Sequence, residues 1–96
     1  MPTSTAQVPA EWPQRYVKQI VAHLGRKRTG RMLATGDGEV EWPDGSCGLA
    51  CRPGVLLLTV TADDAEALAR IQDVIGRHLE RFGARAGIRV DWTPPQ

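Results

Sequence analysis

Residues 27–61 are divided into short segments by turn signals, in which glycine stands next to aspartate or proline. These signals are Gly36-Asp37-Gly38, Pro43-Asp44-Gly45 and Pro53-Gly54. Between them, apolar side chains alternate with polar or small ones, so that each segment has one apolar face. A period of two with one polar face is typical of antiparallel strands joined by tight turns. The pattern predicts a β-meander over this part of the chain, with its first strand around Arg31–Thr35.

The alternation also assigns side chains to the two faces of the predicted sheet. Cys47, Leu49 and Cys51 face inward, whereas the small residues Gly48 and Ala50 face outward. The outer face continues on the next segment with Val55, Leu57 and Thr59. A partly apolar outer face favours a protein partner, or a homodimer formed through the open side of the sheet.

The two cysteines stand four positions apart on one predicted strand. At ~3.3 Å per residue, the Cα atoms of Cys47 and Cys51 would be about 13 Å apart. A disulfide needs Cα atoms within about 7 Å of each other, so we expect both thiols to be free. Free thiols are typical of proteins in the reducing cytoplasm.

Two further segments carry apolar residues at the spacing of a helix. Residues 14–26 are predicted to be helical from the positions of Val17, Ile20, Val21 and Leu24. Residues 63–82 are predicted to form a longer helix from Leu68, Ile71, Ile75, Leu79 and Phe82. Asp63 is the expected N-cap of this second helix, with Glu66 as its capping-box partner. Gly76 inside the helix predicts close packing against the sheet.

The two ends of the chain are interpreted differently. Residues 1–13 show no period and contain several prolines, so we expect them to form a flexible N-terminal tail. Residues 88–93 alternate again and are predicted to form a closing strand, leaving residues 14–96 as a single domain. The expected order of elements is α-β-β-β-β-α-β. This order predicts a two-layer α+β sandwich, in which an antiparallel sheet of about five strands carries two helices on one face.

Charge and hydropathy narrow the classes of function. The 96 residues include 12 Lys and Arg against 11 Asp and Glu, a net charge of +1, whereas nucleic-acid-binding domains carry a clear basic excess. A basic run is followed by an acidic one, which we interpret as opposite charges on neighbouring strands: Arg26, Lys27, Arg28 and Arg31, then Asp37, Glu39, Glu41 and Asp44. No apolar run reaches the ~18 residues of a membrane span, and the first residues do not resemble a signal peptide. We therefore expect a cytoplasmic protein that binds neither nucleic acid nor membrane.

His23 and His78 are the first candidates for a functional site. Each stands near the end of a predicted helix, at the edge of its apolar stripe, so both helices can direct an imidazole to the same region. Imidazole is a common metal ligand, but the sequence has no diagnostic spacing and no further ligand clustered with either histidine. We therefore predict no metal site, and the histidines remain weak candidates for one. The sequence identifies no cofactor and contains none of the common catalytic motifs, which argues against an enzyme.

Four segments of the chain resemble a bacterial family known as domain of unknown function 2218. They are Tyr16-Val17-Lys18-Gln19-Ile20 running on to His23, Asp64-Ala65-Glu66-Ala67-Leu68-Ala69-Arg70, Val74-Ile75-Gly76-Arg77-His78-Leu79-Glu80-Arg81-Phe82, and Ile88-Arg89-Val90-Asp91-Trp92. The resemblance implies a small α+β fold and an association with siderophore-interacting, flavin-dependent reductases, and so with iron uptake. It draws attention to Lys18, His23, His78, Arg81 and Phe82. The cysteines Cys47 and Cys51 are not part of the family pattern.

Together these observations favour a non-enzymatic binding or accessory module, linked to iron or siderophore metabolism. The expected ligand is a small anion, and the residues expected to bind it are Lys18, His23, His78 and Arg81. The other expected kind of partner is a protein. Two alternatives remain. One is a metal- or haem-dependent enzyme that uses the two histidines, and the other is a structural homodimer formed through the open sheet face.

Overall fold

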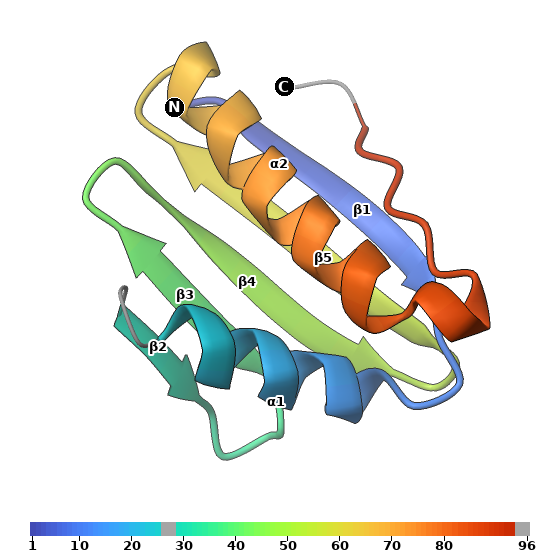
Figure 1. The fold of residues 1–96 in the computed structure, drawn as a ribbon. Coiled ribbons are helices and arrows are strands. Elements are labelled where there is room, and N and C mark those ends of the chain that lie inside the picture. The colour runs from blue at the N-terminus through green and yellow to red at the C-terminus, as the bar shows by residue number, and fades with distance from the viewer. Residues whose placement is uncertain (26–28, 94–96) are drawn as a thin grey trace.

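A computed structural model, which describes residues 1–25 and 29–93, shows a five-stranded antiparallel sheet with both long helices on one face (Figure 1). The elements are β1 (Thr3–Pro9), α1 (Pro13–Leu24), β2 (Thr29–Met32), β3 (Gly38–Trp42), β4 (Gly45–Arg52), β5 (Val55–Ala62), α2 (Ala65–Phe82) and a 3₁₀ turn, η1 (Ala84–Ala86). The strands lie in the order β1-β5-β4-β3-β2. The predicted α+β sandwich is confirmed, but the order of elements is β-α-β-β-β-β-α.

The meander of β2 to β5 follows the predicted alternation. Val40, Cys47 and Val60 are paired side by side across three strands, and all three are fully buried. The first strand of the meander, β2, begins and ends earlier than the sequence predicts. Arg31 lies opposite Glu39, and its guanidinium contacts the carboxylates of Glu39 and Glu41 at 3.3 and 3.1 Å. These contacts confirm the pairing of opposite charges at Arg31, whereas the basic residues at 26–28 lie outside the described part of the chain.

The prediction of a flexible tail over residues 1–13 is wrong for most of its length. Residues 3–9 form β1, which pairs antiparallel with β5 along its whole length, from Thr3 opposite Thr61 to Pro9 opposite Val55. Its inward-facing side chains are Ser4, Ala6 and Val8, and all are buried. Two of these three are small, so the alternation has a weak hydropathy signal, and the prolines at either side hide it further.

The predicted closing strand over residues 88–93 is also wrong. This segment runs beside β1, one of the two edge strands of the sheet, and joins it through Thr93, whose N–H donates to Thr5 O at 2.8 Å (Figure 1). The backbone N–H of Val90 donates instead to the Glu80 carboxylate of α2 at 3.0 Å. Because its backbone is divided between α2 and β1, the segment forms no regular ladder. It nevertheless covers part of the exposed edge of the sheet, a common protection against edge-to-edge association.

The two helices lie over different halves of the sheet. The first, α1, contacts β2, β3 and β4, and the second, α2, contacts β4 and β5. The N-cap of α2 is Asp64 and not Asp63, because the Asp64 carboxylate accepts the N–H of Ala67 at 2.8 Å. The N–H of Asp63 donates to the carbonyl of Asp44 and ties the start of α2 to the β3–β4 turn. Neither helix of the described chain is long and apolar enough to span a membrane.

Candidate functional site

The two histidines of the chain meet on the helical side of the molecule. His23 comes from the last turn of α1 and is exposed, while His78 comes from the second half of α2 and is half-buried. Their ring centroids are 4.9 Å apart and their planes are inclined by 52°. The fold therefore places in contact two side chains that are 55 positions apart in the sequence.

Phe82 completes this group of rings. It lies one helical turn after His78 on α2, with its centroid 5.7 Å from that of His23 and 6.1 Å from that of His78. The Phe82 and His23 planes are inclined by 80°, an edge-to-face arrangement that aromatic rings favour. We call His23, His78 and Phe82 the ring cluster. It joins the two helices at their solvent side, where His23 remains accessible.

The hydrogen bond made by His78 determines which of its nitrogens is available. Its Nδ1 lies 2.7 Å from the carbonyl oxygen of Val74, four residues earlier on α2. A carbonyl can only accept, so Nδ1 must carry the proton. In the neutral ring the lone pair is then on Nε2, the nitrogen that is free to bind a ligand.

A shallow groove continues from the ring cluster toward the start of α1. A hollow of about 140 Å³ is lined by Trp12, Arg15, Tyr16, Gln19 and Phe82. A larger hollow of about 540 Å³ adjoins it and shares three of these residues: Trp12, Arg15 and Tyr16. The Trp12 side chain is 59% exposed although it occupies the N-cap position of α1. We call the five residues of the smaller hollow the aromatic groove.

The structure brings together some of the residues expected in a ligand site and not others. His23 and His78 are in contact, and Arg81 lies one turn beyond His78 on the same side of α2, where it is exposed. Lys18 lies five positions before His23 in α1, which corresponds to roughly 140° around the helix. Because His23 faces α2, Lys18 is on the flank of α1 that faces away from α2. Lys18 is therefore not part of the group formed by the ring cluster and Arg81.

The sequence does not predict the aromatic groove, because Trp12 lies within residues 1–13, the segment predicted to be a flexible tail. The signal that could have found it is local. A proline at the first position of a helix fixes where the helix begins, and the preceding tryptophan is then held at its end. Trp12 lines the groove together with Tyr16 and Phe82, and exposed apolar side chains that gather in this way indicate a candidate binding surface.

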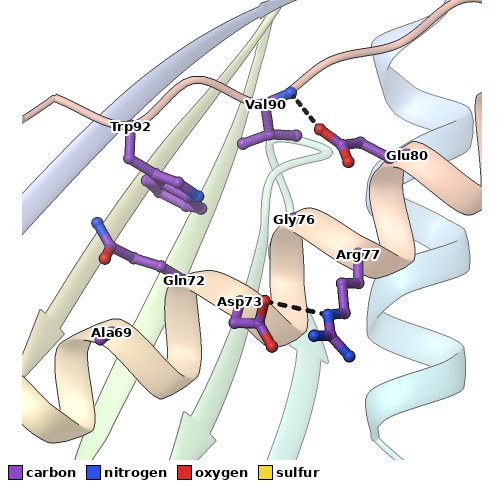
Figure 2. A pocket seen from close by; sticks show the side chains of 8 residues that line it. All are labelled: Ala69, Gln72, Asp73, Gly76, Arg77, Glu80, Val90 and Trp92. Carbon is purple, nitrogen blue, oxygen red and sulfur yellow. Dashed lines mark hydrogen bonds and ion pairs between the residues drawn. The ribbon is translucent and has the colours of Figure 1, made fainter.

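A third hollow lies on the opposite flank of α2, against the closing segment, and has a volume of about 310 Å³ (Figure 2). Its charged groups are already paired, since Asp73 contacts Arg77 at 3.1 Å and Glu80 accepts the N–H of Val90. The expectation that Gly76 packs against the sheet is wrong. A Cβ added there would meet Trp92 Nε1 at 3.6 Å, so Gly76 faces the closing segment and has room for a methyl group.

Both cysteines are free thiols, as the spacing predicts. Cys47 is completely buried, and burial raises its pKa to about 12. Burial also raises the pKa of Cys51, and the nearby Asp37 carboxylate adds to this effect. Within residues 1–25 and 29–93, no three His, Cys, Asp or Glu side chains gather as a metal-binding group. The cysteines therefore do not join the histidines in one site.

Comparison with known proteins adds the family. A family model described as an uncharacterized protein conserved in bacteria, domain of unknown function 2218, matches residues 5–93. The chain belongs to this family. The match begins inside β1 and ends at Thr93, so the domain of unknown function 2218 includes both the edge strand and the segment that covers it.

A solved structure has the same fold. The NMR structure of PA4090 from Pseudomonas aeruginosa is similar over 98% of this chain and 97% of that one, with a TM-score of 0.82 and 29% identity. No curated protein matches the chain.

The family model that matches residues 5–93 confirms the family expected from the sequence.

Proposed function

We propose that this member of the domain of unknown function 2218 family is a non-enzymatic binding module for a small anion that carries an aromatic ring. The ligand would lie in the aromatic groove with its anionic group toward the ring cluster. The observation that carries the proposal is the contact of His23 with His78, 4.9 Å apart, beside Phe82 at the head of the groove.

The groove offers complementary chemistry for such a ligand. The exposed Trp12 and the side of Phe82 supply flat apolar surfaces on which an aromatic ring can stack. Arg15 supplies a guanidinium, which binds carboxylates and other planar anions through paired hydrogen bonds. The five residues that line the smaller hollow include no acidic side chain, so nothing in that lining repels an anion.

We extend the proposal to iron or siderophore metabolism as the context. Siderophores commonly carry anionic oxygens on or beside aromatic rings, and a cation next to an aromatic wall suits that chemistry. The association implied by the family resemblance points to the same context. An aryl carboxylate with neighbouring hydroxyl groups is therefore the ligand class to test first.

The test is an NMR titration of uniformly ¹⁵N-labelled protein, treated with EDTA to remove metal ions, with 2,3-dihydroxybenzoate. We expect saturable shifts in the amide signals of residues 12–23 and 78–82. Benzyl alcohol, which lacks the charge, and citrate, which lacks the ring, should bind more weakly. Arg15→Gln should weaken binding at least about fivefold. A hydrogen bond to a charged group contributes roughly 1.5–3 kcal/mol, and it reaches this range only when it is shielded from water.

The matched control is Arg89→Gln, which removes an exposed arginine from the closing segment, away from the groove lining. Its affinity for 2,3-dihydroxybenzoate should equal that of the unchanged protein. Shifts that stay linear to millimolar concentration, or that map to the sheet, would contradict the proposal. Equal losses in the two arginine variants would show that binding depends only on net charge.

A second candidate, a homodimer through the outer sheet face, is favoured by a separate observation. A hollow of about 320 Å³ on that face is lined in part by Gly48, Ala50, Leu57 and the exposed Leu33, together with the acidic side chains of Asp37 and Glu39. In Figure 1, neither helix of the described chain lies on this side. Sedimentation velocity at increasing concentration tests the candidate, and Leu57→Glu should abolish any dimer that it detects.

A further inference from the structure

We infer that His23 and His78 form a two-ligand site for a divalent transition metal ion, for which Zn²⁺ is the probe. The inference goes beyond the proposed function, because an ion can bind to the imidazoles while the groove is empty. Only its last step, in which an anionic ligand completes the coordination, rests on the proposed function.

The separation of the rings fits a shared ion. When two imidazoles bind a tetrahedral ion at about 2.0–2.1 Å, their centroids lie about 5 Å apart, because each centroid is roughly 1 Å behind its ligating nitrogen. The observed centroid distance is 4.9 Å. His23 is exposed, so its ring can turn about its side-chain bonds to direct a nitrogen at the ion without moving α1.

The hydrogen bond of His78 is a second, independent observation. Histidines that bind metals usually donate their other ring N–H to a carboxylate or a backbone carbonyl, which fixes the tautomer and orients the ring. His78 makes this bond from Nδ1 to the carbonyl of Val74 at 2.7 Å. The carbonyl belongs to a regular turn of α2, so the orientation of the ring is built into the helix.

The site would leave part of the coordination sphere open. In the part of the chain that the structure describes, no third His, Cys, Asp or Glu side chain is grouped with the two histidines. A four-coordinate ion would therefore bind two further donors from solution, one more than in the open zinc sites of enzymes, where three protein ligands leave one position free. The groove starts at Phe82 of the ring cluster, so an anionic oxygen of a ligand in the groove is placed to supply one of them.

The experiment uses the untagged full chain, because its only imidazoles are those of His23 and His78. Long-range ¹H–¹⁵N spectra of the ring nitrogens are recorded during titration with Zn²⁺ alone. We expect both rings to shift with one shared dissociation constant, to saturate at one ion per monomer, and Nδ1 of His78 to keep its proton. His23→Gln and His78→Gln should each weaken Zn²⁺ binding by at least about tenfold, since even loss of a supporting hydrogen bond typically has that effect.

The matched control is Cys51→Ser, which removes the half-buried thiol and should leave Zn²⁺ affinity unchanged. The inference is overturned if neither ring shifts at millimolar Zn²⁺, if the two rings titrate separately, or if either histidine variant binds as tightly as the unchanged chain. One ion bound per two chains, with a doubled mass in sedimentation, overturns it as well. The spectra of the unchanged protein decide the question even if a variant folds poorly.

The two proposals fail independently. The 2,3-dihydroxybenzoate titration is made without metal, and the Zn²⁺ titration is made without an organic ligand. Loss of the first result with retention of the second removes the proposed function and leaves the metal site. The reverse result removes only the metal site.

Discussion

Gly83 follows directly after α2 as its C-cap, and it leaves no room for a side chain. A Cβ at this position would lie 2.6 Å from Cβ of Ile88 and 3.1 Å from Cε1 of Tyr16, and it would meet Cγ1 of Ile88 still more closely. The Gly83 backbone has a φ of −99°, which alanine adopts readily. Any effect of Gly83→Ala therefore arises from packing and not from backbone conformation.

The magnitude follows from two opposing terms. Overpacking of a close-packed site destabilises a protein by about 1–3 kcal/mol, and the upper end applies because Cβ of Ile88 is fixed to the backbone and cannot rotate away. Replacing glycine by alanine at an accommodating φ stabilises by about 0.4–1 kcal/mol through the unfolded state. We expect Gly83→Ala to lower the free energy of unfolding by about 2 kcal/mol. With a urea slope of roughly 1–2 kcal/mol per molar, the unfolding midpoint should fall by about 1–2 M.

The assay is urea unfolding followed by tryptophan fluorescence, with Gly76→Ala as the matched control. A Cβ at Gly76 would meet Trp92 Nε1 at 3.6 Å and Val90 Cβ at 3.9 Å, which are ordinary contacts. Inside a helix, alanine is favoured over glycine by about 0.5–1 kcal/mol, so this variant should be more stable than the unchanged chain. If Gly83→Ala proved as stable as Gly76→Ala, the close packing of Ile88 on the end of α2 would be refuted.

Two further predictions concern the start of α2 and the buried thiol. Asp64→Ala should reduce the free energy of unfolding by about 1 kcal/mol, because the variant loses the N-cap of α2. Asp63→Ala should change the free energy of unfolding by less than about 0.5 kcal/mol. Thermal unfolding of both variants measures the difference between them. Above the ordinary thiol pKa of 9.0, unfolded Cys47 loses its proton while folded Cys47, with its pKa raised to about 12, keeps it. The unfolded chain then binds fewer protons, so stability should fall between pH 9 and 12 by roughly 1 kcal/mol per pH unit. Urea unfolding at pH 8 and pH 10.5 measures this loss, and a Cys47→Ala variant with the same loss would contradict the assignment.

Local patterns were sufficient for the elements with strong periodicity. The stripe of α2 and the turns of the meander depend on neighbours in sequence, so spacing alone located α2 and β3 to β5 to within a few residues. The choice of N-cap shows the limit of such reasoning. Asp63 and Asp64 have the same side chain, so the sequence cannot distinguish them as caps. In the structure, the backbone of Asp64 is extended, and this conformation directs the Asp64 carboxylate to the N–H of Ala67.

The fifth strand of the sheet could not be chosen from local patterns. Residues 3–9 alternate between buried and exposed in the structure, but their sequence shows no clear hydropathy period. Residues 88–93 alternate in the sequence itself and have the larger apolar side chains. In the structure, β1 nevertheless pairs with β5. The closing segment contacts α2 through Val90 and the edge of β1 through Thr93. Two segments compete for one edge of the sheet, and only the packing of the whole chain decides between them.

Hydropathy period and turn chemistry, which act over a few neighbouring residues, thus determined the fold class, the meander, both helices and the free state of the cysteines. The site depended on the tertiary structure, because the positions of helix faces relative to one another are set by how each helix packs on the sheet. That packing brings His23 against His78 and Phe82, turns Lys18 to the far flank of α1, and holds Trp12 at the end of the groove. Contacts between residues more than fifty positions apart follow from these packing angles, which no local pattern in the sequence encodes.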